Sequence, residues 1–418
     1  MLTNEERRVP IYFDAESNPP TDASAVTPDT PLESLNLNWR ERDLPQRLRT
    51  KHVHGLHPYL GKFVPQLVEI FLRKYFRPGQ TVLDPFVGSG TTLVQANELG
   101  IHSIGCDISA FNVLLCKVKT DQYDLGTARR EVRDILRKTR ERAKPRIRQL
   151  SFFEQPAVYS VPTRVDNDYL QGWYAPQALA ELIAYRDLIR SEGYQYQDLL
   201  KVILSRAARS ARLTTHFDLD FPAHPQREPY WCHKHNRVCA PTQEALKFFE
   251  RYSLDTVQRI EAFMAVRTNA AVTIHHGDSR RIAFAEADGI ITSPPYVGLI
   301  DYHEQHIYAY HLLGLEDNRQ EEIGPAANGS SKRAREEYQG NIIAVFHNAL
   351  NSVRPGGRII VVAGDRYDLY PDIARAIGVE VEATLNRHVN RRTGRRSSEF
   401  YETIFIWRNL GTITGKVE

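Results

Sequence analysis

The sequence predicts an α/β fold in which a doubly wound sheet is interrupted by a long, mostly helical insert. Short apolar runs alternate with amphipathic helices from about residue 66 to 120, and the alternation resumes near residue 272. This is the pattern of strands joined by crossover helices. Between about 121 and 270 the alternation stops. We therefore divide the chain into a first half of the core (36–120), an inserted domain (121–270) and a second half of the core (271–418).

Composition sets the broad class of the protein. The chain has 418 residues, a quarter of them charged, with a formal net charge of +3. There is no apolar run of about 18 residues and no signal-peptide pattern, so we expect a cytoplasmic protein without a membrane partner. Four cysteines are too few for a disulfide framework. Residues 1–35 lack apolar periodicity, which predicts a mobile or loosely docked N-terminal arm.

The first half of the core contains a glycine loop in a strand and helix context. A strand over 81–84 leads into Asp84, Pro85, Phe86, Val87, Gly88, Ser89 and Gly90, a helix follows, and a second strand ends in Asp107. Glycines let a backbone approach a ligand closely, and the N–H groups that open a helix can face an anion. Asp107 follows Gly90 by 17 residues, near the spacing at which an acid takes ribose hydroxyls. The sequence predicts a nucleoside-cofactor site here.

The second half contains a strand that ends in two prolines. A short apolar run, 289–291, enters Thr292, Ser293, Pro294, Pro295 and Tyr296. Proline has no N–H and a fixed φ, so this segment leaves the sheet as a rigid loop with free carbonyls. One interpretation is a site where a planar heterocycle stacks on the tyrosine, and the other is a packed turn. Asp278 follows the preceding strand, and ligands of open α/β sheets bind at such carboxyl ends.

Three basic segments are possible nucleic-acid contacts. Arginines and lysines crowd a predicted helix over 129–148, where a solvated helix face is an equal interpretation. Arg206, Arg209 and Arg212 recur every third residue of a helix over 197–213, which favours phosphate binding, although acidic partners nearby are an alternative. A loop between the last two predicted strands carries Arg391, Arg392, Arg395 and Arg396. An arginine-rich loop of this kind favours nucleic-acid contact.

A short segment of the insert carries metal-ligand side chains. Cys232, His235 and Cys239 could hold three corners of a tetrahedral zinc, with His233, His216 or His224 as the fourth. Their spacing matches no standard zinc pair. The alternative is a hairpin with two packed thiols.

Four motifs together resemble one enzyme family. They are D-P-F-x-G-S-G-T-T at 84–92, T-S-P-P-Y at 292–296, H-P-Y-L-G-K-F at 57–63 and P-G-G-R-I-I-V-V at 355–362. The chain resembles, over about 51–120 and 272–408, the amino-methylating DNA methyltransferases that use S-adenosylmethionine. The resemblance implies a Rossmann-like methyltransferase sheet. With the cofactor motif before the catalytic motif, it also implies a target-recognition, DNA-binding domain over 121–270.

The resemblance also implies roles for particular residues. The cofactor-binding set would be Phe63, Asp84, Phe86, Gly88, Ser89, Gly90, Asp107 and Asp278. The catalytic loop would be Ser293, Pro294, Pro295 and Tyr296. Ser293 and the carbonyl of Pro294 would accept hydrogen bonds from the target amine, and Tyr296 would stack on a base flipped out of the duplex. The methyl group would then move by direct displacement, without a covalent enzyme intermediate or a metal.

Serine before the two prolines resembles the cytosine-N4 group of this family. Tyr296 stands where 5-methylcytosine enzymes need a cysteine. We therefore expect a site-specific cytosine-N4 DNA methyltransferase. The expected partners are double-stranded DNA and a cognate restriction endonuclease that acts on the same site. The alternatives are adenine-N6 methylation, methylation of RNA or a protein amide, and a non-catalytic nucleic-acid-binding protein with the same fold.

Overall fold

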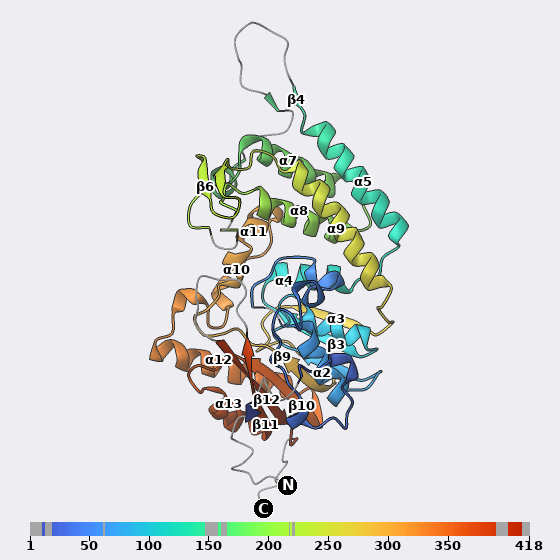
Figure 1. The fold of residues 1–418 in the computed structure, drawn as a ribbon, viewed down its shortest axis with the longest axis vertical. Coiled ribbons are helices and arrows are strands. Elements are labelled where there is room, and N and C mark those ends of the chain that lie inside the picture. The colour runs from blue at the N-terminus through green and yellow to red at the C-terminus, as the bar shows by residue number, and fades with distance from the viewer. Residues whose placement is uncertain are drawn as a thin grey trace, which may run out of the picture. The chain divides into compact units, whose positions relative to one another are not determined.

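The computed structural model describes residues 11–12, 19–61, 63–146, 158–159, 165–216, 218–219, 222–389 and 400–411. The chain forms two compact units (Figure 1). The first comprises Met1–Thr120, Ala265–Asp301 and Asn318–Glu418, and the second comprises Asp121–Met264 and Tyr302–Asp317. The second unit thus takes in a short segment after the T-S-P-P-Y motif, whereas the sequence-based division assigned that segment to the core.

The first unit is built on one eight-stranded sheet with the order β1-β11-β12-β10-β9-β2-β3-β8. Its strands are β1 (Ile11–Tyr12), β2 (Thr81–Asp84), β3 (His102–Asp107), β8 (Val272–His276), β9 (Ala287–Thr292), β10 (Val353–Ala363), β11 (Glu380–Val389) and β12 (Phe400–Arg408). The five strands from β10 to β8 are parallel, and β12 runs antiparallel between β10 and β11. The chain winds from β2 to β3 and β8 on one side and returns to β9 and β10 on the other. The predicted doubly wound sheet is confirmed, and its winding reverses between β2 and β9.

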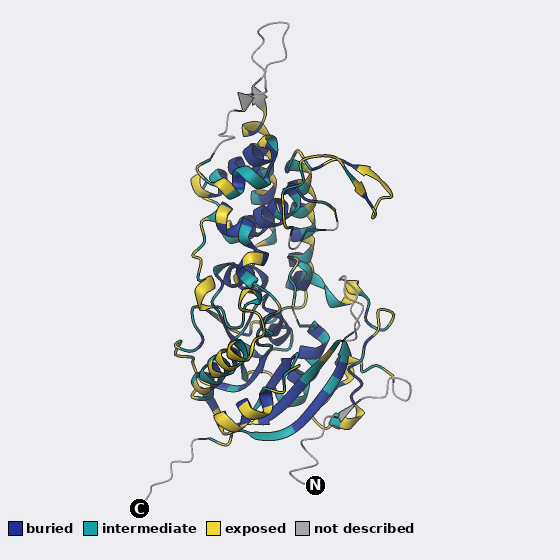
Figure 2. Cartoon of the chain, turned by 90° about the vertical axis from the view of Figure 1, so that its left-hand side faces the viewer, coloured by how far each residue is buried: buried dark blue, intermediate teal, exposed yellow. Residues whose placement is uncertain are grey.

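Helices cover both faces of this sheet (Figure 1). They are α1 (Gln46–Arg49), α2 (Pro65–Tyr75), α3 (Thr91–Glu98), α4 (Ala110–Thr120), α12 (Lys332–Leu350) and α13 (Tyr370–Ile377). Alternate residues of β10 show how the strands serve two cores. Ile360 and Val362 belong to the cluster of α2, while Ile359 and Val361 belong to the cluster of α12 and α13. A strand buried on both faces reads as a continuous apolar run, as this one does. Figure 2 shows the central strands as largely buried.

The segment before α1 differs from its predicted looseness. Within residues 19–37, Ala23, Val26, Leu35 and Leu37 are buried in the same core cluster as α2. Short 3₁₀ turns at Ala23–Ala25 and Leu32–Ser34 bring these apolar residues inward. Their spacing follows turns rather than a helix or strand period. That is why the sequence pattern did not reveal a docked segment.

The second unit is mainly helical. Its helices are α5 (Leu125–Arg142), α6 (Asp168–Trp173), α7 (Pro176–Ser191), α8 (Gln197–Ala211), α9 (Leu246–Met264), α10 (Tyr302–Gln305) and α11 (Ile307–Leu313). Its short strands are β4 (Pro145–Arg146), β5 (Val158–Tyr159), β6 (Tyr230–Cys232) and β7 (Arg237–Cys239). The rings of Tyr185 and Phe249 stack at 4.2 Å between α7 and α9. Buried Glu181 accepts the N–H groups of Ala245 and Leu246 and so caps α9.

The described helices include none with the length and apolarity that a bilayer crossing requires.

Candidate active site

The loops at the carboxyl ends of four parallel strands are joined by short hydrogen bonds. Thr292, at the end of β9, donates its hydroxyl to the carboxylate of Asp84 at the end of β2, at 2.6 Å. Ser279, after β8, donates to the carbonyl of Pro85 at 2.6 Å. The N–H of Gly277 donates to the carbonyl of Asp107 at 3.0 Å. The glycine loop and the T-S-P-P-Y loop therefore lie side by side at the switch point, where open sheets bind ligands.

Asp84 is the buried link in this set. Its carboxylate accepts from the N–H of Phe86 at 3.1 Å as well as from Thr292, and its side chain is buried. Burial raises the pKa of Asp84 to about 6, against the opposing effect of these hydrogen bonds. Asp84 thus orients the start of the glycine loop and the end of β9 together.

The glycine loop packs closely against neighbouring side chains. Gly88 and Gly90 have φ values of +48° and +80°, in the left-handed region that favours glycine. A Cβ at Gly88 would lie 3.2 Å from the hydroxyl oxygen of Tyr59, and a Cβ at Gly90 would lie 3.0 Å from the sulfur of Cys116. The hydroxyl of Ser89 is buried and has no hydrogen-bond partner within the described parts of the chain. A buried polar atom of this kind is suited to a bound ligand.

Asp107 is held firmly at the tip of β3. Its carboxylate accepts from the N–H of Gly88 at 2.8 Å, from the N–H of Ser109 at 2.8 Å and from the side-chain amide of Asn112 at 3.1 Å. These donors orient the carboxylate at the tip of β3. This is the place and the chemistry predicted for a ribose-binding acid.

Asp278 lies in the loop after β8 and is paired within the protein. Arg280 Nε lies 2.9 and 3.0 Å from its two carboxylate oxygens, and the N–H of Arg280 donates to it at 2.9 Å. Burial works to raise the pKa of Asp278, but the hydrogen bonds and charge of Arg280 outweigh it and lower the pKa. This pair was not predicted, although an arginine two residues after the acid was a signal for it in the sequence.

The two aromatic residues predicted beside the cofactor are both partly buried. Phe63 packs on the core cluster of α2, and Phe86 packs on that of α12. They belong to the two different cores that flank the sheet. Phe63 precedes α2, and Phe86 follows β2. Each keeps some exposed ring surface that a ligand could cover.

The T-S-P-P-Y loop is fixed from β10 and α12. The hydroxyl of Ser293 donates to the carbonyl of Val362 at 2.9 Å. Since that hydroxyl has one hydrogen, the oxygen of Ser293 is left as an acceptor. Tyr338 on α12 donates to the carbonyl of Pro295 at 2.9 Å. Among the described residues no donor to the carbonyl of Pro294 is present, while the Ser293 hydroxyl also interacts with that of Tyr296.

Tyr296 is held by two residues that sequence reasoning missed. Its hydroxyl donates to the carboxylate of Glu402 on β12 at 3.0 Å, and Glu402 is paired with Arg387 on β11 at 2.6 Å. Burial and the charge of Glu402 raise the pKa of the Tyr296 hydroxyl well above its ordinary range. Its ring lies 6.2 Å from that of Phe400. A buried arginine and glutamate at facing strand positions would have been the signal, but strand register is not visible in one sequence.

The predicted arginine contacts on α8 need correction. Arg206 is buried, with its guanidinium 2.5 Å from Asp255 and 4.5 Å from the ring centre of Tyr252. Arg212 is buried too, and it donates to the carbonyl of Leu219 at 2.5 Å. Arg206 lies on a side of α8 that packs inside the unit, and Arg212 follows the end of the helix in an extended conformation. Arg209 is partly exposed, and Arg391, Arg392, Arg395 and Arg396 lie outside the described residues.

The basic helix α5 is also rich in acidic partners. Arg129 pairs with Glu261 at 2.7 Å, and Arg140 pairs with Glu250 at 2.5 Å. Arg137 contacts two acids of its own helix. The described arrangement favours the solvated, ion-paired face that the sequence left open.

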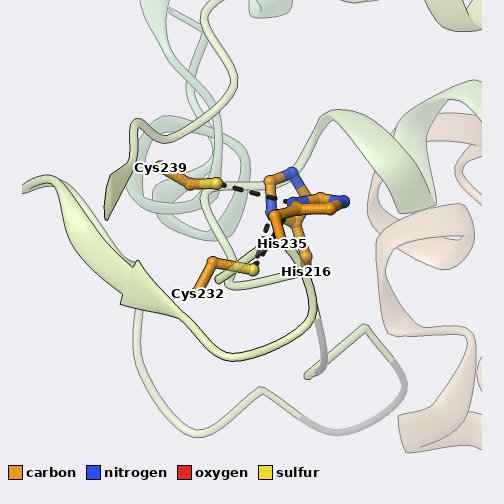
Figure 3. A group of neighbouring side chains, drawn as sticks. All are labelled: His216, Cys232, His235 and Cys239. Atoms are coloured by element: carbon orange, nitrogen blue, oxygen red, sulfur yellow. Dashed lines mark hydrogen bonds between the residues drawn. The ribbon is translucent and has the colours of Figure 1, made fainter. Parts of the chain in front are cut away.

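The possible metal ligands come together in the second unit. Cys232, His235 and Cys239 are joined by His216, and the ligand atoms of the four residues lie within 4.8 Å of one another (Figure 3). Of the three histidines considered for the fourth corner, the structure selects His216.

A family model and several related sequences match this chain. The profile of a family described as DNA methylase matches residues 28–117. The type II methyltransferase M.MjaII of Methanocaldococcus jannaschii is 37% identical over 87% of this chain and 81% of its own length. The type II methyltransferase M.BsoBI of Geobacillus stearothermophilus is 23% identical over 67% of this chain and 56% of its own. A crystal structure of TrmN from Thermus thermophilus overlaps with a TM-score of 0.33 and 12% identity, over 84% of this chain and 50% of that one.

The cradle of the glycine loop fits the cofactor of this family. Ser89 offers an unmatched buried hydroxyl, and Asp107 presents an oriented carboxylate. The cofactor is S-adenosylmethionine, which supplies an electrophilic methyl group when bound. From the match to M.MjaII along most of both chains, together with this site, the chain belongs to the type II amino-group DNA methyltransferases.

Proposed function

We propose that this methyltransferase modifies the exocyclic N4 amine of a cytosine flipped out of duplex DNA at a specific site. The observation that carries the proposal is Ser293, placed one residue beyond the bond between Thr292 and Asp84. That bond fixes the start of the catalytic loop against the cofactor loop. A base held by Ser293 would thus have its amine directed at the cofactor methyl group.

Ser293 and the following carbonyl would orient the amine. Because Ser293 donates its only hydroxyl hydrogen to Val362, its oxygen can only accept. Two acceptors, this oxygen and the carbonyl of Pro294, match the two N–H bonds of an exocyclic amine. Hydrogen bonds from the amine to both draw the nitrogen toward tetrahedral geometry and localise its lone pair for attack.

Tyr296 would hold the ring of the flipped base. Its hydroxyl is tied to Glu402 at 3.0 Å, which fixes the ring beside the loop. Base stacking on an aromatic side chain is worth about 1–3 kcal/mol. A neutral serine before the two prolines resembles the motif of the cytosine-N4 members of the family. This favours cytosine over adenine as the target base.

The identity of the product base tests this proposal. Duplex DNA of mixed sequence is incubated with the protein and S-adenosylmethionine and is then digested for nucleoside mass spectrometry. We expect 4-methylcytosine. A product of N6-methyladenine instead would transfer the same mechanism to adenine and overturn the cytosine assignment.

A serine variant tests the role of the loop. For Ser293→Ala we expect kcat to fall about 100- to 1,000-fold, as when an orienting hydrogen bond of a transition state is lost. Affinity for S-adenosylmethionine, measured by calorimetry, should stay within about twofold of wild type. Unchanged turnover, or loss of cofactor binding in a folded variant, would contradict this role.

We also propose that a restriction endonuclease with the same recognition site accompanies this protein in the cell. The type II class of its relatives supports this partnership. Protection of DNA methylated by the protein against cleavage in an extract of the source organism would test it.

A further inference from the structure

We propose that His216, Cys232, His235 and Cys239 form a structural Zn²⁺ site in the second unit. Two thiols and two imidazoles are a standard ligand set for tetrahedral zinc. They come from two places in the chain. His216 follows α8, and the other three lie on the β6–β7 hairpin. Figure 3 shows the four side chains directed toward one another.

The distances between ligand atoms fit a tetrahedron. The sulfur of Cys232 lies 3.6 Å from Nδ1 of His216 and 3.5 Å from Nδ1 of His235, and the sulfur of Cys239 lies 3.5 Å from Nδ1 of His235. Zinc bonds of about 2.3 Å to sulfur and about 2.0 Å to nitrogen, at tetrahedral angles, separate sulfur from nitrogen by about 3.5 Å. All three measured edges agree with this value.

Hydrogen bonding alone accounts less well for the arrangement. Nδ1 of an imidazole has one in-plane lone pair or one N–H, so it makes one well-directed hydrogen bond. His235 Nδ1 is equidistant from two sulfurs, which is the geometry of ligands around a common ion. Cys232 and Cys239 are both free thiols, and they are not paired across the hairpin, since Cys232 faces Arg237 and Cys239 faces Tyr230.

The hairpin also needs a source of stability that its sequence lacks. Its strands have three residues each, and Trp231 and Val238 are 51% and 63% exposed. Isolated two-stranded hairpins are marginal in water. The buried side chains of the strand pair are the two cysteines, so metal bonds would replace the missing apolar core.

Local contacts already hold the ligands in place. The N–H of His235 donates to the carbonyl of Cys232 at 3.1 Å, and Asn236 adopts a φ of +50° to close the turn. Tyr230 accepts the N–H of His216 at 2.9 Å, and its hydroxyl also lies 3.0 Å from Nδ1 of that residue. Zinc would replace the second contact and keep the first. Binding would release the two thiol protons, and the resulting thiolates balance the charge of the ion.

Four protein ligands leave no open position, so this zinc would be structural and would take no part in methyl transfer. It would join the end of α8 to the hairpin. The hairpin would then present Lys234 and Arg237, both exposed, at a fixed place on the second unit.

Metal content is the first test. The full-length protein, purified without chelators, should contain about one zinc per chain by plasma mass spectrometry. His235→Asn should lose most of the zinc. His233→Asn is the matched control, with the same change two residues away on the same turn, and should keep it. Absence of zinc in wild type, or equal zinc in the two variants, would overturn the proposal.

Cobalt substitution gives a result that does not depend on any variant folding. Wild-type protein that is stripped of metal and loaded with Co²⁺ should show the intense visible absorption of tetrahedral cobalt together with thiolate charge-transfer bands. A weak octahedral spectrum, or no bound cobalt, would contradict a two-thiolate site.

Proteolysis tests the structural role. Trypsin should cut after Lys234 or Arg237 rapidly once the metal is chelated, and slowly after zinc is restored. Equal cleavage in both states would show that the hairpin does not depend on the ion.

Discussion

The buried carboxylate of Asp84 affects the stability of the fold and also holds two loops of the site together. It is buried at the end of β2, and its carboxylate holds both Thr292 and the backbone of Phe86. Burial raises its pKa from 3.8 to about 6. A carboxyl group with a raised folded-state pKa favours folding most when it is protonated. Its contribution is therefore complete below about pH 4 and is lost as pH rises through about 6.

We predict that Asp84→Asn changes stability with this pH profile. The amide keeps an acceptor oxygen for Thr292 and removes the buried charge. Relative to wild type, the melting temperature of the variant should rise between roughly pH 4 and pH 7, and a shift of about two pKa units corresponds to about 3 kcal/mol. Thermal unfolding of both proteins across this range measures the difference. A difference that does not change with pH would show that Asp84 is not the group responsible.

Gly90 allows a test of shape at the cofactor loop. Gly90→Ala places a Cβ at 3.0 Å from Cys116 and forces a left-handed φ, while Gly79→Ala forces a similar φ of +85° with no atom within 4 Å. Both should lose about 1–2 kcal/mol of stability from backbone strain. Only Gly90→Ala should bind S-adenosylmethionine at least tenfold more weakly, as measured by calorimetry. Equal affinity in the two variants would indicate that the loop does not approach the cofactor.

Strands β11 and β12 make the contribution to the catalytic loop that was least expected from the sequence. They face each other at Arg387 and Glu402, a buried ion pair that holds the hydroxyl of Tyr296. Removing one partner of a buried ion pair strongly destabilises a protein, because the other charge is left buried without its partner. The catalytic loop after β9 therefore depends on two strands that are distant in sequence.

We predict that Arg387→Met destabilises the protein by about 3–5 kcal/mol. Adding Glu402→Gln should recover part of this loss, since the second change removes the unpaired charge. Arg358→Met is the control, because Arg358 on β10 and Glu382 on β11 also form an ion pair, at 2.9 Å across the intervening β12, but are more exposed. That pair should be worth about 0–1 kcal/mol. Urea unfolding of wild type, the single variants Arg387→Met, Glu402→Gln and Arg358→Met, and the double variant gives the comparison. Additive effects at Arg387 and Glu402 would argue against coupling.

Elements with a clear period were predictable, and those set by tertiary contacts were not. The strands and loops around Asp84, Asp107 and Thr292 were located from apolar runs and glycines. Helix α12 begins at Lys332, about nine residues before its apolar period, because Ser331 caps it in a polar stretch. Helix α7 went unpredicted because it is apolar on nearly all sides, being packed within the second unit.

The site showed the same contrast between features set by local sequence and features set by tertiary contacts. Local motifs indicated the cofactor and catalytic loops, whose residues are close in sequence. The partners of Tyr296, the Arg280 contact of Asp278 and the burial of Arg206 depend on which faces pack together. A residue spacing gives the side of a helix on which arginines lie, but not whether that side meets solvent or another helix. His216 could be named as a fourth zinc ligand but not chosen over the other two histidines.

For the whole molecule, the distribution of charge matters more than its sum. The net charge is only +3. Several cations of α5 already contact acids, and Arg206 and Arg212 are buried. Cations with acidic partners add little to phosphate binding. The arginines at 391–396 are therefore our preferred phosphate contacts, as the sequence predicted.

We predict that these arginines set the salt dependence of DNA binding. Replacing Arg391 and Arg392 with alanine should reduce the slope of log affinity against log salt by about 2, since each phosphate contact contributes about 0.9. Replacing Arg137 and Arg140, which are ion-paired on α5, removes the same charge and should leave the slope nearly unchanged. Fluorescence anisotropy at several salt concentrations measures both. Equal slopes for the two variants would contradict the assignment.

The position of β12 has a consequence for biosynthesis. This strand is the last of the sheet in sequence, yet it lies between β10 and β11 and supplies Glu402 to the hydroxyl of Tyr296. On the ribosome, the cofactor loop emerges hundreds of residues before the strand that anchors the catalytic tyrosine. The hydroxyl of Tyr296 can therefore gain its anchor only after β12 has been synthesised.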